Sequence, residues 1–333
     1  MTIQTASEQE IVKLLILIPI FNDWEAVSQL LERLDQALSL PGFRFDVLIV
    51  DDASTISPDA SRFTLPAFKN IDYVGVIELR RNFGHQRAIA LGLSYIVANL
   101  ECRAVVIMDG DGEDDPFDVP RLIEQCASER YATMVFARRG KRSEGLLFTV
   151  FYQLYKWIYK VLTGHRIRFG NFSVVPFDLA RRLVVVSEVW NHYAVGALKA
   201  KIPYVEVPAA RGRRLTGKTK MNFATLVMHG LSAVSVFSEV VGVRLLIVSS
   251  LLILFASAGI AVVVGIRLTT TMAIPGWASY LVASLSIMLV QAVSLSLFFV
   301  FMVLSARNNA FFLPLRDHSH FIDRVRSVFS VDE

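Results

Sequence analysis

The sequence predicts an α/β domain of alternating strands and helices, followed by a hairpin of two membrane-spanning helices. The chain has 333 residues, of which 53% are hydrophobic and only 19% charged, which is too apolar for an ordinary soluble protein. Short apolar runs alternate with helical patterns over the first 240 residues or so, and two long uncharged stretches follow, at residues 245–266 and 268–306. These features exclude a disordered chain, a collagen-like fibre and a disulfide scaffold.

Five apolar runs predict strands, at residues 14–19, 47–51, 73–79, 104–108 and 133–137. Three segments with apolar residues three or four positions apart predict helices, at residues 24–38, 86–99 and 119–127. Strands that alternate with helices form a mostly parallel sheet with helices on both faces, and ligands bind at the carboxyl ends of its strands. Polar residues gather at those ends, at Asn22 and Asp23, Asp51 and Asp52, Arg80 to Asn82, and Asp109 to Asp115.

Two further helices are expected beyond these strands. Residues 146–162 are rich in aromatic side chains and carry Lys156 and Lys160, which fits either a helix at the bilayer surface or a plain core helix. Residues 221–241 place apolar side chains on one stripe with Glu239 as the single charge, and predict an amphipathic helix at the membrane interface.

The two uncharged stretches predict a transmembrane hairpin. A bilayer core of about 30 Å needs about 20 apolar residues, and residues 245–266 and 277–305 each suffice. The short link between them carries a single arginine, whereas Arg244 precedes the first span and Arg307 follows the second. By the positive-inside rule, the α/β domain and both chain ends are expected in the cytoplasm.

The densest motif is MDGDGEDDP, in which a buried strand ends in Asp109, Asp111 and Glu113. Alternate carboxylates on an extended segment can converge on one hard divalent cation. A calcium-binding loop is excluded, because Asp114 stands where that loop needs glycine and Pro120 where it needs glutamate. For this segment taken alone, the alternative is a solvated acidic turn.

Two further motifs follow strands. IVDDAS ends in Asp51 and Asp52, which could bind ribose hydroxyls or a base edge, although turns and caps also use aspartate. LRRNFGHQRAIALGL places three arginines at a strand-to-helix turn, where their side chains could bind phosphate. The alternative is that these arginines are exposed on a loop. The small residues of the motif allow close helix packing. His85 is expected to be a turn residue. No glycine-rich dinucleotide fingerprint follows the first strand.

In their order, these motifs resemble the family 2 glycosyltransferases of the GT-A fold. The matching stretches are LIPIFND, IVDDAS, LRRNFGHQRAIALGL, MDGDGEDDP, FARRGKR with FYQLY after it, and RGRRLTGKTK, over about residues 14–220. The sequence is most similar to the polyprenyl-phosphate glycosyltransferases, which include dolichyl-phosphate mannose synthases and bacterial undecaprenyl-phosphate glucose synthases. The resemblance implies a GT-A, Rossmann-like fold and a multi-pass glycosyltransferase (a hexosyltransferase of the EC 2.4 class) in the plasma (inner) membrane.

The resemblance also implies roles for individual residues. The nucleotide-sugar donor is expected at Pro19, Asn22, Asp51, Asp52, Arg80, Asn82, Gly84, Asp109 and Asp111. Mg2+ or Mn2+ is expected at Asp109, Asp111 and Glu113. The acceptor phosphate is expected at Arg138, Arg139, Arg142, Arg211, Arg214, Thr219 and Lys220. For the late basic loop alone, the alternative is a juxtamembrane patch attracted to anionic lipid.

The implied reaction transfers a sugar from a UDP- or GDP-sugar to polyprenyl (undecaprenyl) phosphate with inversion, for cell-envelope glycan or glycolipid synthesis. A lipid monophosphate, with a second pKa of about 6, is largely a dianion at neutral pH and needs no base. A lipid hydroxyl acceptor would need one, and Asp115 is the nearest candidate, so the catalytic candidates are Asp109, Asp111 and Asp115. A non-catalytic membrane partner that retains the fold is the alternative from another class.

Two motifs depart from the family pattern, at three positions. Gly170-Asn171-Phe172-Ser173 stands where the family commonly has Gly-Asp-Phe-Arg, and Ala53 stands where it commonly has glycine. The first departure removes an opposite-charge pair near the expected sugar or acceptor pocket, so the resemblance does not fix the donor sugar or the acceptor.

The sequence therefore predicts four parts: a glycosyltransferase domain over residues 1–220, an amphipathic helix over 221–241, the hairpin over 242–306 and a cytoplasmic tail over 307–333. The expected partners are a nucleotide sugar, a polyprenyl phosphate and the membrane. A net charge of +4 is too small to indicate a nucleic-acid partner, and the sequence leaves a homo-oligomer open.

Overall fold

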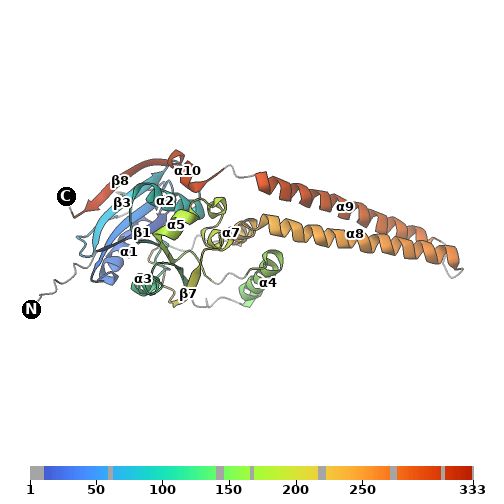
Figure 1. The fold of residues 1–333 in the computed structure, drawn as a ribbon, viewed down its shortest axis with the longest axis horizontal. Helices are drawn as coiled ribbons and strands as arrows, with labels where there is room; N and C mark the ends of the chain where they lie inside the picture. The colour runs from blue at the N-terminus through green and yellow to red at the C-terminus, as the bar shows by residue number, and fades with distance from the viewer. Residues whose placement is uncertain are drawn as a thin grey trace, which may run out of the picture. The chain divides into compact units, whose positions relative to one another are not determined.

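The computed structural model describes residues 11–58, 63–139, 146–165, 169–216, 223–270, 276–308 and 312–331 (Figure 1). The chain divides into two compact units. The sheet unit comprises Met1–Phe148, Ile167–Val236 and Phe312–Glu333, and the helical unit comprises Thr149–Arg166 and Phe237–Phe311.

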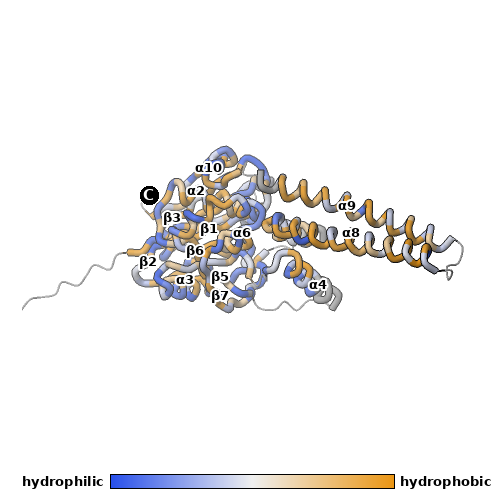
Figure 2. Tube along the Cα trace, turned by 45° about the vertical axis from the view of Figure 1, so that its right-hand side comes forward, coloured by the Kyte–Doolittle hydropathy of each residue, from blue (hydrophilic) through white to orange (hydrophobic). Residues whose placement is uncertain are grey.

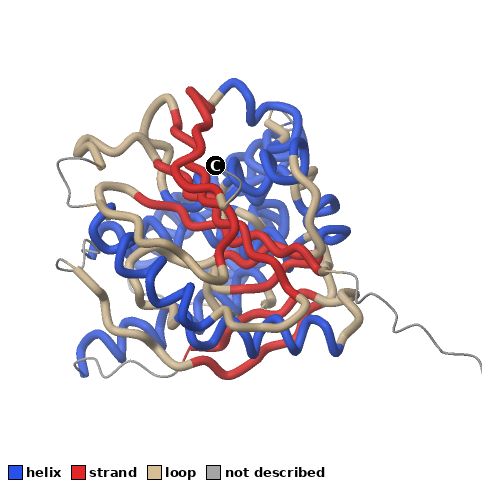
Figure 3. Tube along the Cα trace, turned by 90° about the vertical axis from the view of Figure 1, so that its left-hand side faces the viewer, coloured by secondary structure: helices blue, strands red, loops and turns tan. Residues whose placement is uncertain are grey.

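A mixed sheet forms the centre of the sheet unit, with helices around it (Figure 3). It has eight strands in the order β7-β5-β6-β4-β1-β2-β3-β8. The strands are β1 (Val12–Ile20), β2 (Phe43–Asp51), β3 (Ile71–Leu79), β4 (Ala104–Ile107), β5 (Met134–Arg139), β6 (Ser173–Pro176), β7 (Tyr204–Ala209) and β8 (Ile322–Ser330). β1 pairs in parallel with β2 and β4, β2 with β3, and β5 with β7, whereas β6 and β8 run antiparallel to their neighbours. The predicted mostly parallel sheet is confirmed.

Helices cover both faces of this sheet, as the sequence predicts. α1 (Trp24–Ala37) and α3 (Val119–Ser128) pack on one face, against Leu14, Ile16 and Ile18 of β1. α2 (His85–Asn99), α5 (Phe177–Leu183) and α6 (Tyr193–Lys199) pack on the other, against Leu15 and Leu17. Because successive residues of β1 enter opposite cores, the strand reads as a continuous apolar run.

The first five strands and three helices lie where the sequence predicts them, within a few residues, whereas β6, β7, β8, α5 and α6 were not foreseen. The clearest difference is the segment expected to be a tail. After α10 (Pro314–Asp317) and the short helix η4 (His318–His320), β8 adds to the sheet beside β3. Glu78 of β3 accepts hydrogen bonds from Arg324 (2.6 Å) and Arg326 (2.8 Å) of β8.

The helical unit contains α4 (Leu146–Thr163), which begins in the sheet unit, and two long helices, α8 (Ser238–Thr269) and α9 (Trp277–Asn308). The long helices pack side by side, with Ser249 and Ser296 hydroxyls 2.7 Å apart, and hydrophobic residues line both (Figure 2). Both are long and apolar enough to cross a membrane. The most apolar 18-residue stretch is only 17% buried in α8 and 6% buried in α9. The predicted spans lie inside them.

The predicted amphipathic helix over residues 221–241 is not continuous. α7 (Phe223–Ser235) ends before Phe237, which is the N-cap residue of α8. The exposed side chains of α7 include Val227, Met228 and Leu231. Its predicted place at a membrane interface remains a prediction.

Candidate active site

The predicted site residues that the structure describes lie along one edge of the sheet. β1 to β5 and β7 run in the same direction, so their carboxyl ends share this edge. β6 and β8 run in the opposite direction, so their amino ends lie there too. This topology brings together segments that are far apart in the chain, which is the usual origin of a ligand site in such sheets.

An acidic turn, residues 109–115, follows β4 at this edge. The carboxylate of Asp114, only 1% exposed, accepts a hydrogen bond from the Asp109 amide at 2.9 Å. The Asp111 carboxylate accepts one from the Glu113 amide, also at 2.9 Å. Asp114 therefore folds the turn, whereas one oxygen of Asp111 and the carboxylate of Glu113 face outward to other partners.

Those partners belong to a basic loop, residues 211–216, which follows β7. Arg211 forms an ion pair with Glu113 (Nη2 to Oε2, 2.5 Å), and Arg214 forms one with Asp111 (Nη1 to Oδ2, 2.9 Å). Nη2 of Arg214 also lies 3.5 Å from a carboxylate oxygen of Asp23, which follows β1. The two motifs that the sequence singled out for opposite charges are thus in direct contact.

Backbone contacts hold the acidic turn and the basic loop together as well. The amide of Gly212 donates to the carbonyl of Glu113, and the amide of Leu215 donates to that of Asp111, both at 2.9 Å. A Cβ atom at Gly212 would collide with the carbonyl oxygen of Gly112. Glycine is required here because the two backbones approach too closely for any side chain.

The predicted metal ligands fit Mg2+ or Mn2+ in their chemistry, since all three are hard carboxylate oxygens. Burial and the neighbouring Asp109 raise the pKa of Asp111 despite its contact with Arg214, so this carboxylate would gain from a further positive charge. Among the described residues, however, no three Asp, Glu, His or Cys side chains are gathered closely enough to hold an ion. The predicted set of Asp109, Asp111 and Glu113 is not assembled here, and Asp111 and Glu113 contact arginines of the basic loop instead.

On the side predicted to bind the donor, two buried carboxylates bind backbone amides. Asp51 accepts from the amide of Ser54 at 2.9 Å. Asp52, 3% exposed, accepts from the amides of Phe83 and Gly84, both at 2.7 Å. Burial raises the pKa of both carboxyl groups. Asp52 thereby joins the end of β2 to the turn before α2, a structural role that the sequence did not indicate.

Asn22 joins two loops of the same side. Its backbone adopts a positive φ of 56°, and its side-chain oxygen accepts from the amides of Thr55 (2.8 Å) and Ile56 (3.0 Å). Pro19 is buried at the end of β1 and Asn82 is exposed. Arg80 is 57% exposed and lies 3.3 Å from a carboxylate oxygen of Asp323, so β8 supplies its partner in this structure.

His85, which the sequence predicts to be a turn residue, lies close to the acidic turn, and the sequence did not reveal this contact. It is the first residue of α2, and its Nε2 lies 3.0 Å from an oxygen of Asp109. Burial lowers the pKa of His85, but the carboxylates of Asp109, Asp111 and Asp114 outweigh this effect and raise it. Asn171, one of the departures from the family pattern, places its Nδ2 3.1 Å from the same ring nitrogen. The order of β6 in the sheet, which the sequence did not reveal, produces this contact.

The predicted acceptor residues are described only in part. Arg138, at the end of β5, is exposed, with Nη1 3.9 Å from a carboxylate oxygen of Glu206. The backbone of Arg139 ends the same strand. Arg142, Thr219 and Lys220 lie outside the described residues. The structure thus brings Arg211 and Arg214 to the acidic turn. All the acceptor assignments remain predictions.

Asp115, the candidate base, caps a helix. Its carboxylate accepts from the amide of Phe117 at 3.1 Å, at the start of the short helix η2 (Pro116–Asp118). This is the ordinary role of aspartate at such a position. The geometry gives Asp115 a structural function and leaves its use as a base untested.

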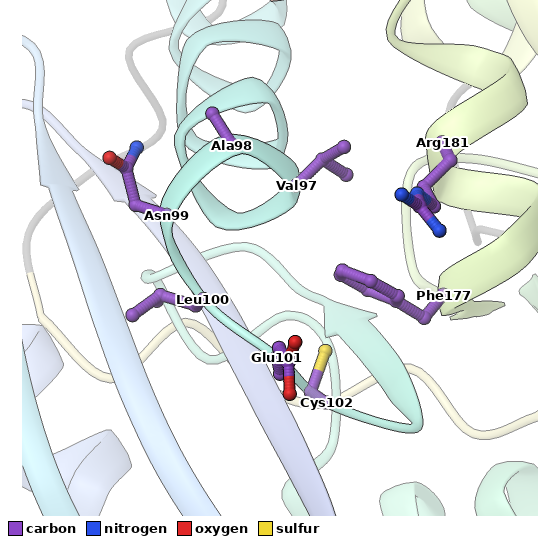
Figure 4. A pocket seen from close by; sticks show the side chains of 8 residues that line it. All are labelled: Val97, Ala98, Asn99, Leu100, Glu101, Cys102, Phe177 and Arg181. Carbon is purple, nitrogen blue, oxygen red and sulfur yellow. The ribbon is translucent and has the colours of Figure 1, made fainter.

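A pocket of about 470 Å3 lies elsewhere, between the end of α2 and the start of α5 (Figure 4). Glu101, Cys102, Phe177 and Arg181 are among the residues that line it. These residues flank the amino end of β4 and the carboxyl end of β6, at the edge opposite the acidic turn. The pocket is therefore separate from the candidate active site.

The chain is similar to several bacterial transferases. It is 30% identical over 131 residues to the undecaprenyl-phosphate 4-deoxy-4-formamido-L-arabinose transferase of Klebsiella pneumoniae, covering 39% of this chain and 38% of that protein. It is 29% identical over 136 residues to the dodecaprenyl-phosphate galacturonate synthase of Rhizobium johnstonii, covering 40% and 38%. A longer match, 27% identical over 286 residues, covers 81% of this chain and 82% of the uncharacterized glycosyltransferase YkcC of Bacillus subtilis. The chain thus spans well under half the length of the first two relatives.

Among solved structures, the fold is similar to the glucosyl-3-phosphoglycerate synthase of Mycobacterium tuberculosis in complex with Mn2+, UDP-glucose and phosphoglyceric acid. The TM-score is 0.48 and the identity 12%, over 73% of this chain and 86% of that chain. This similarity is too weak to carry information on metal or substrate. The mixed, mostly parallel sheet with helices on both faces is nevertheless the GT-A-like arrangement that the motifs implied. Residues 15–188, just over half of the chain, match Glycosyl transferase family 2, and the protein belongs to this family of glycosyltransferases.

Proposed function

We propose that this glycosyltransferase transfers a sugar from a UDP- or GDP-sugar to polyprenyl phosphate, with inversion, at the cytoplasmic face of the membrane. The observation that carries the proposal is the pairing of the basic loop with the acidic turn at the carboxyl edge of the sheet. Arg211 contacts Glu113 at 2.5 Å and Arg214 contacts Asp111 at 2.9 Å. A donor diphosphate and an acceptor phosphate need groups of these two opposite charges side by side.

The acidic turn is the proposed donor side. Mg2+ or Mn2+ bound by Asp109, Asp111 and Glu113 would neutralise the nucleoside diphosphate as it leaves. The chain itself presents the carboxylates at the end of β4, with Asp114 folding the turn behind them. The neighbouring loops, tied together through Asn22 and Asp52, would shape the nucleoside pocket.

The basic loop is the proposed acceptor side. The guanidinium groups of Arg211 and Arg214 suit phosphate oxygens, which they can bind through two parallel hydrogen bonds. Both side chains are partly accessible, 26% and 17% exposed, so a phosphate can compete with the carboxylates for them. A phosphate dianion is already a nucleophile, so what it needs from these residues is position and neutralised charge.

The membrane side of the proposal rests on α8 and α9 and on β8. Because β8 pairs with β3, residues on both sides of the hairpin belong to one sheet. If the two helices cross a membrane, both ends of the hairpin must then lie on the same side. Arg244 before the first apolar stretch and Arg316 after the second favour the cytoplasmic side. Two relatives whose names specify undecaprenyl or dodecaprenyl phosphate support a polyprenyl acceptor.

The test is a transfer assay with the purified full chain, undecaprenyl phosphate, Mn2+ and a panel of labelled UDP- and GDP-sugars. The expected result is label from one donor in the organic-extractable lipid, lost on addition of EDTA and absent with Asp111→Asn. A parallel reaction with diacylglycerol tests a hydroxyl acceptor. Label in diacylglycerol alone, or no labelled lipid although nucleotide still binds, would overturn the proposed acceptor.

A further inference from the structure

A single amide side chain lies inside the apolar hairpin. Gln291 is the only glutamine between Ser238 and Ser305, and that stretch contains no asparagine. It stands at the midpoint of Trp277–Ser305, the part of α9 that is long and apolar enough to cross a membrane. About 20 Å of helix therefore lies on either side of it. In a bilayer with an apolar core of about 30 Å, this amide is too deep to reach the headgroups or water.

Gln291 does not face the other helix of the hairpin. α9 packs against α8 through Ser296, whose hydroxyl lies 2.7 Å from that of Ser249, and through Leu285, whose side chain lies beside Gly259. Successive residues of a helix are rotated by about 100°, so Gln291 lies about 120° or more around α9 from Ser296 and Leu285. Its side chain is exposed, and it has no hydrogen-bond partner in the part of the chain that the structure describes.

Two exposed serines of the hairpin differ from Gln291 in this respect. The hydroxyl of Ser294 donates to the carbonyl of Val290, and that of Ser250 donates to the carbonyl of Leu246, both at 2.9 Å and both within one helix. The amide of Gln291 offers an oxygen acceptor and two N–H donors. Hydrocarbon cannot bond to these groups, so their exposure at this depth is unfavourable unless another chain supplies the partners.

We infer that Gln291 lies in an interface between the hairpins of two copies of this chain, where the two Gln291 side chains bond to each other within the membrane. The inference rests on the proposed crossing of the membrane by α8 and α9. An amide carries both a donor and an acceptor, so two copies related by a twofold axis can form two reciprocal hydrogen bonds. A lipid tail offers neither group. A different protein would need a matching amide at the same depth, which a second copy supplies by symmetry.

The surface around Gln291 suits a helix of the second copy. Exposed side chains form one stripe with it along α9, at Ser284, Met288, Leu295 and Phe298. Phe298 is 61% exposed and Leu295 48% exposed, so most of this stripe is apolar surface that α8 leaves uncovered. A single polar residue in such a stripe fixes the register of two packed helices. The stripe therefore offers the packing surface, and Gln291 aligns the two copies.

The experiment measures energy transfer between two fluorescent labels carried by separate batches of the purified full chain. The two batches are mixed in phosphatidylcholine vesicles at decreasing ratios of protein to lipid. The wild type should show energy transfer that falls on dilution with lipid. Gln291→Leu has a similar size but no donor or acceptor, and should weaken the association about tenfold, the effect of one interhelical hydrogen bond in a membrane. Gln291→Asn keeps an amide and should retain most of the association.

Ser250→Ala is the matched control, because this exposed serine already donates within its own helix. It should associate like the wild type, and circular dichroism checks that each variant is folded. Association that Gln291→Leu leaves unchanged, or that Gln291→Asn weakens as much as Gln291→Leu does, overturns the inference.

Alkaline carbonate extraction of the vesicles separates this inference from the proposed membrane crossing. A wild-type chain that stays in the vesicles but is monomeric at every dilution overturns the inference and leaves the membrane crossing intact. A wild-type chain that carbonate removes does not span the membrane, so the proposed crossing fails and the inference with it.

Discussion

The two sides of the candidate site both carry carboxylate side chains, but these carboxylates have different partners. On the donor side, Asp51 and Asp52 direct their carboxylates at backbone amides. On the other side, the Glu113 carboxylate contacts Arg211, and Asp111 binds a backbone amide with one carboxylate oxygen and contacts Arg214 with the other. A carboxylate that satisfies buried amides cannot leave without orphaning them, whereas one paired with a side chain can exchange it for another charge. We therefore expect Asp52 to act as scaffold, and we expect Asp111 and Glu113 to be able to exchange their arginine partners for a ligand.

The largest effect that would test this comparison is a loss of activity without a loss of stability. Asp111→Asn should lower turnover at least about a hundredfold, because it removes a charge from the proposed cation site. Its free energy of unfolding should change by less than about 1 kcal/mol, as expected for a partly exposed ion pair. Lipid-linked product formation and thermal unfolding measure the two. A folded variant with wild-type turnover would remove Asp111 from the reaction.

Asp52 should show the opposite pattern. Asp52→Ala leaves the amides of Phe83 and Gly84 without their acceptor and should lower the free energy of unfolding by about 2–3 kcal/mol. Asp52→Asn keeps one acceptor oxygen and should cost less. Chemical denaturation measures both, with Asp72→Ala, on a partly exposed residue of β3, as the control. A stability equal to that of the control would show that Asp52 is not scaffold.

A smaller, selective effect is expected in the basic loop. Arg214→Ala should raise the KM for the lipid phosphate about tenfold, with a much smaller change for the nucleotide sugar, since it removes one charge-assisted phosphate contact. Arg213→Ala is the matched control, because this neighbouring arginine is exposed in the same loop. An equal rise in the KM for the lipid phosphate and for the nucleotide sugar would show that Arg214 does not distinguish donor from acceptor. An equal rise in the KM for the lipid phosphate in Arg213→Ala and Arg214→Ala would show the same.

The smallest expected effect is on the free energy of unfolding and concerns the contact between β3 and β8, away from the candidate site. Burial works to raise the pKa of Glu78, but its hydrogen bonds from Arg324 and Arg326 outweigh this and lower it. Because the pKa of Glu78 is lower in the folded protein than in the unfolded chain, these hydrogen bonds stabilise the fold at a pH above the pKa of the unfolded chain. The stabilisation is lost as the pH falls through the pKa of the folded protein. Glu78→Gln should therefore remove about 0.5–1 kcal/mol at neutral pH and little in acid. Denaturation curves at the two pH values measure this, and a loss independent of pH would contradict it.

Much of the sheet unit could be predicted from the sequence because its central strands are buried on both faces. Such strands read as unbroken apolar runs, and β1 to β5 were found on that signal. β6 has only four residues, and β7 and β8 mix buried, partly buried and exposed positions without regular alternation. Their signals are short or mixed with charge, so periodicity does not distinguish them from loops.

The same limit explains which site contacts were missed. Asp111 and Arg214 were found because dense charge motifs are visible along the chain. His85 and Asn171 were not paired, because their contact depends on where β6 lies in the sheet. Asp52 was assigned to the donor, since the sequence does not reveal which amides a buried carboxylate will meet. Motifs identify the chemistry of a site, and the order of the strands decides which motifs touch.

The pairing of β8 with β3 has a consequence for the order of events during synthesis. A ribosome makes β3 early and β8 only after both α8 and α9 have been made. Until then β3 lacks its neighbour on that side and exposes unpaired amides and carbonyls, which are prone to pair with other chains. The sheet is therefore completed only once the apolar hairpin has been made, so a chain that stopped before β8 would present an aggregation-prone edge at β3.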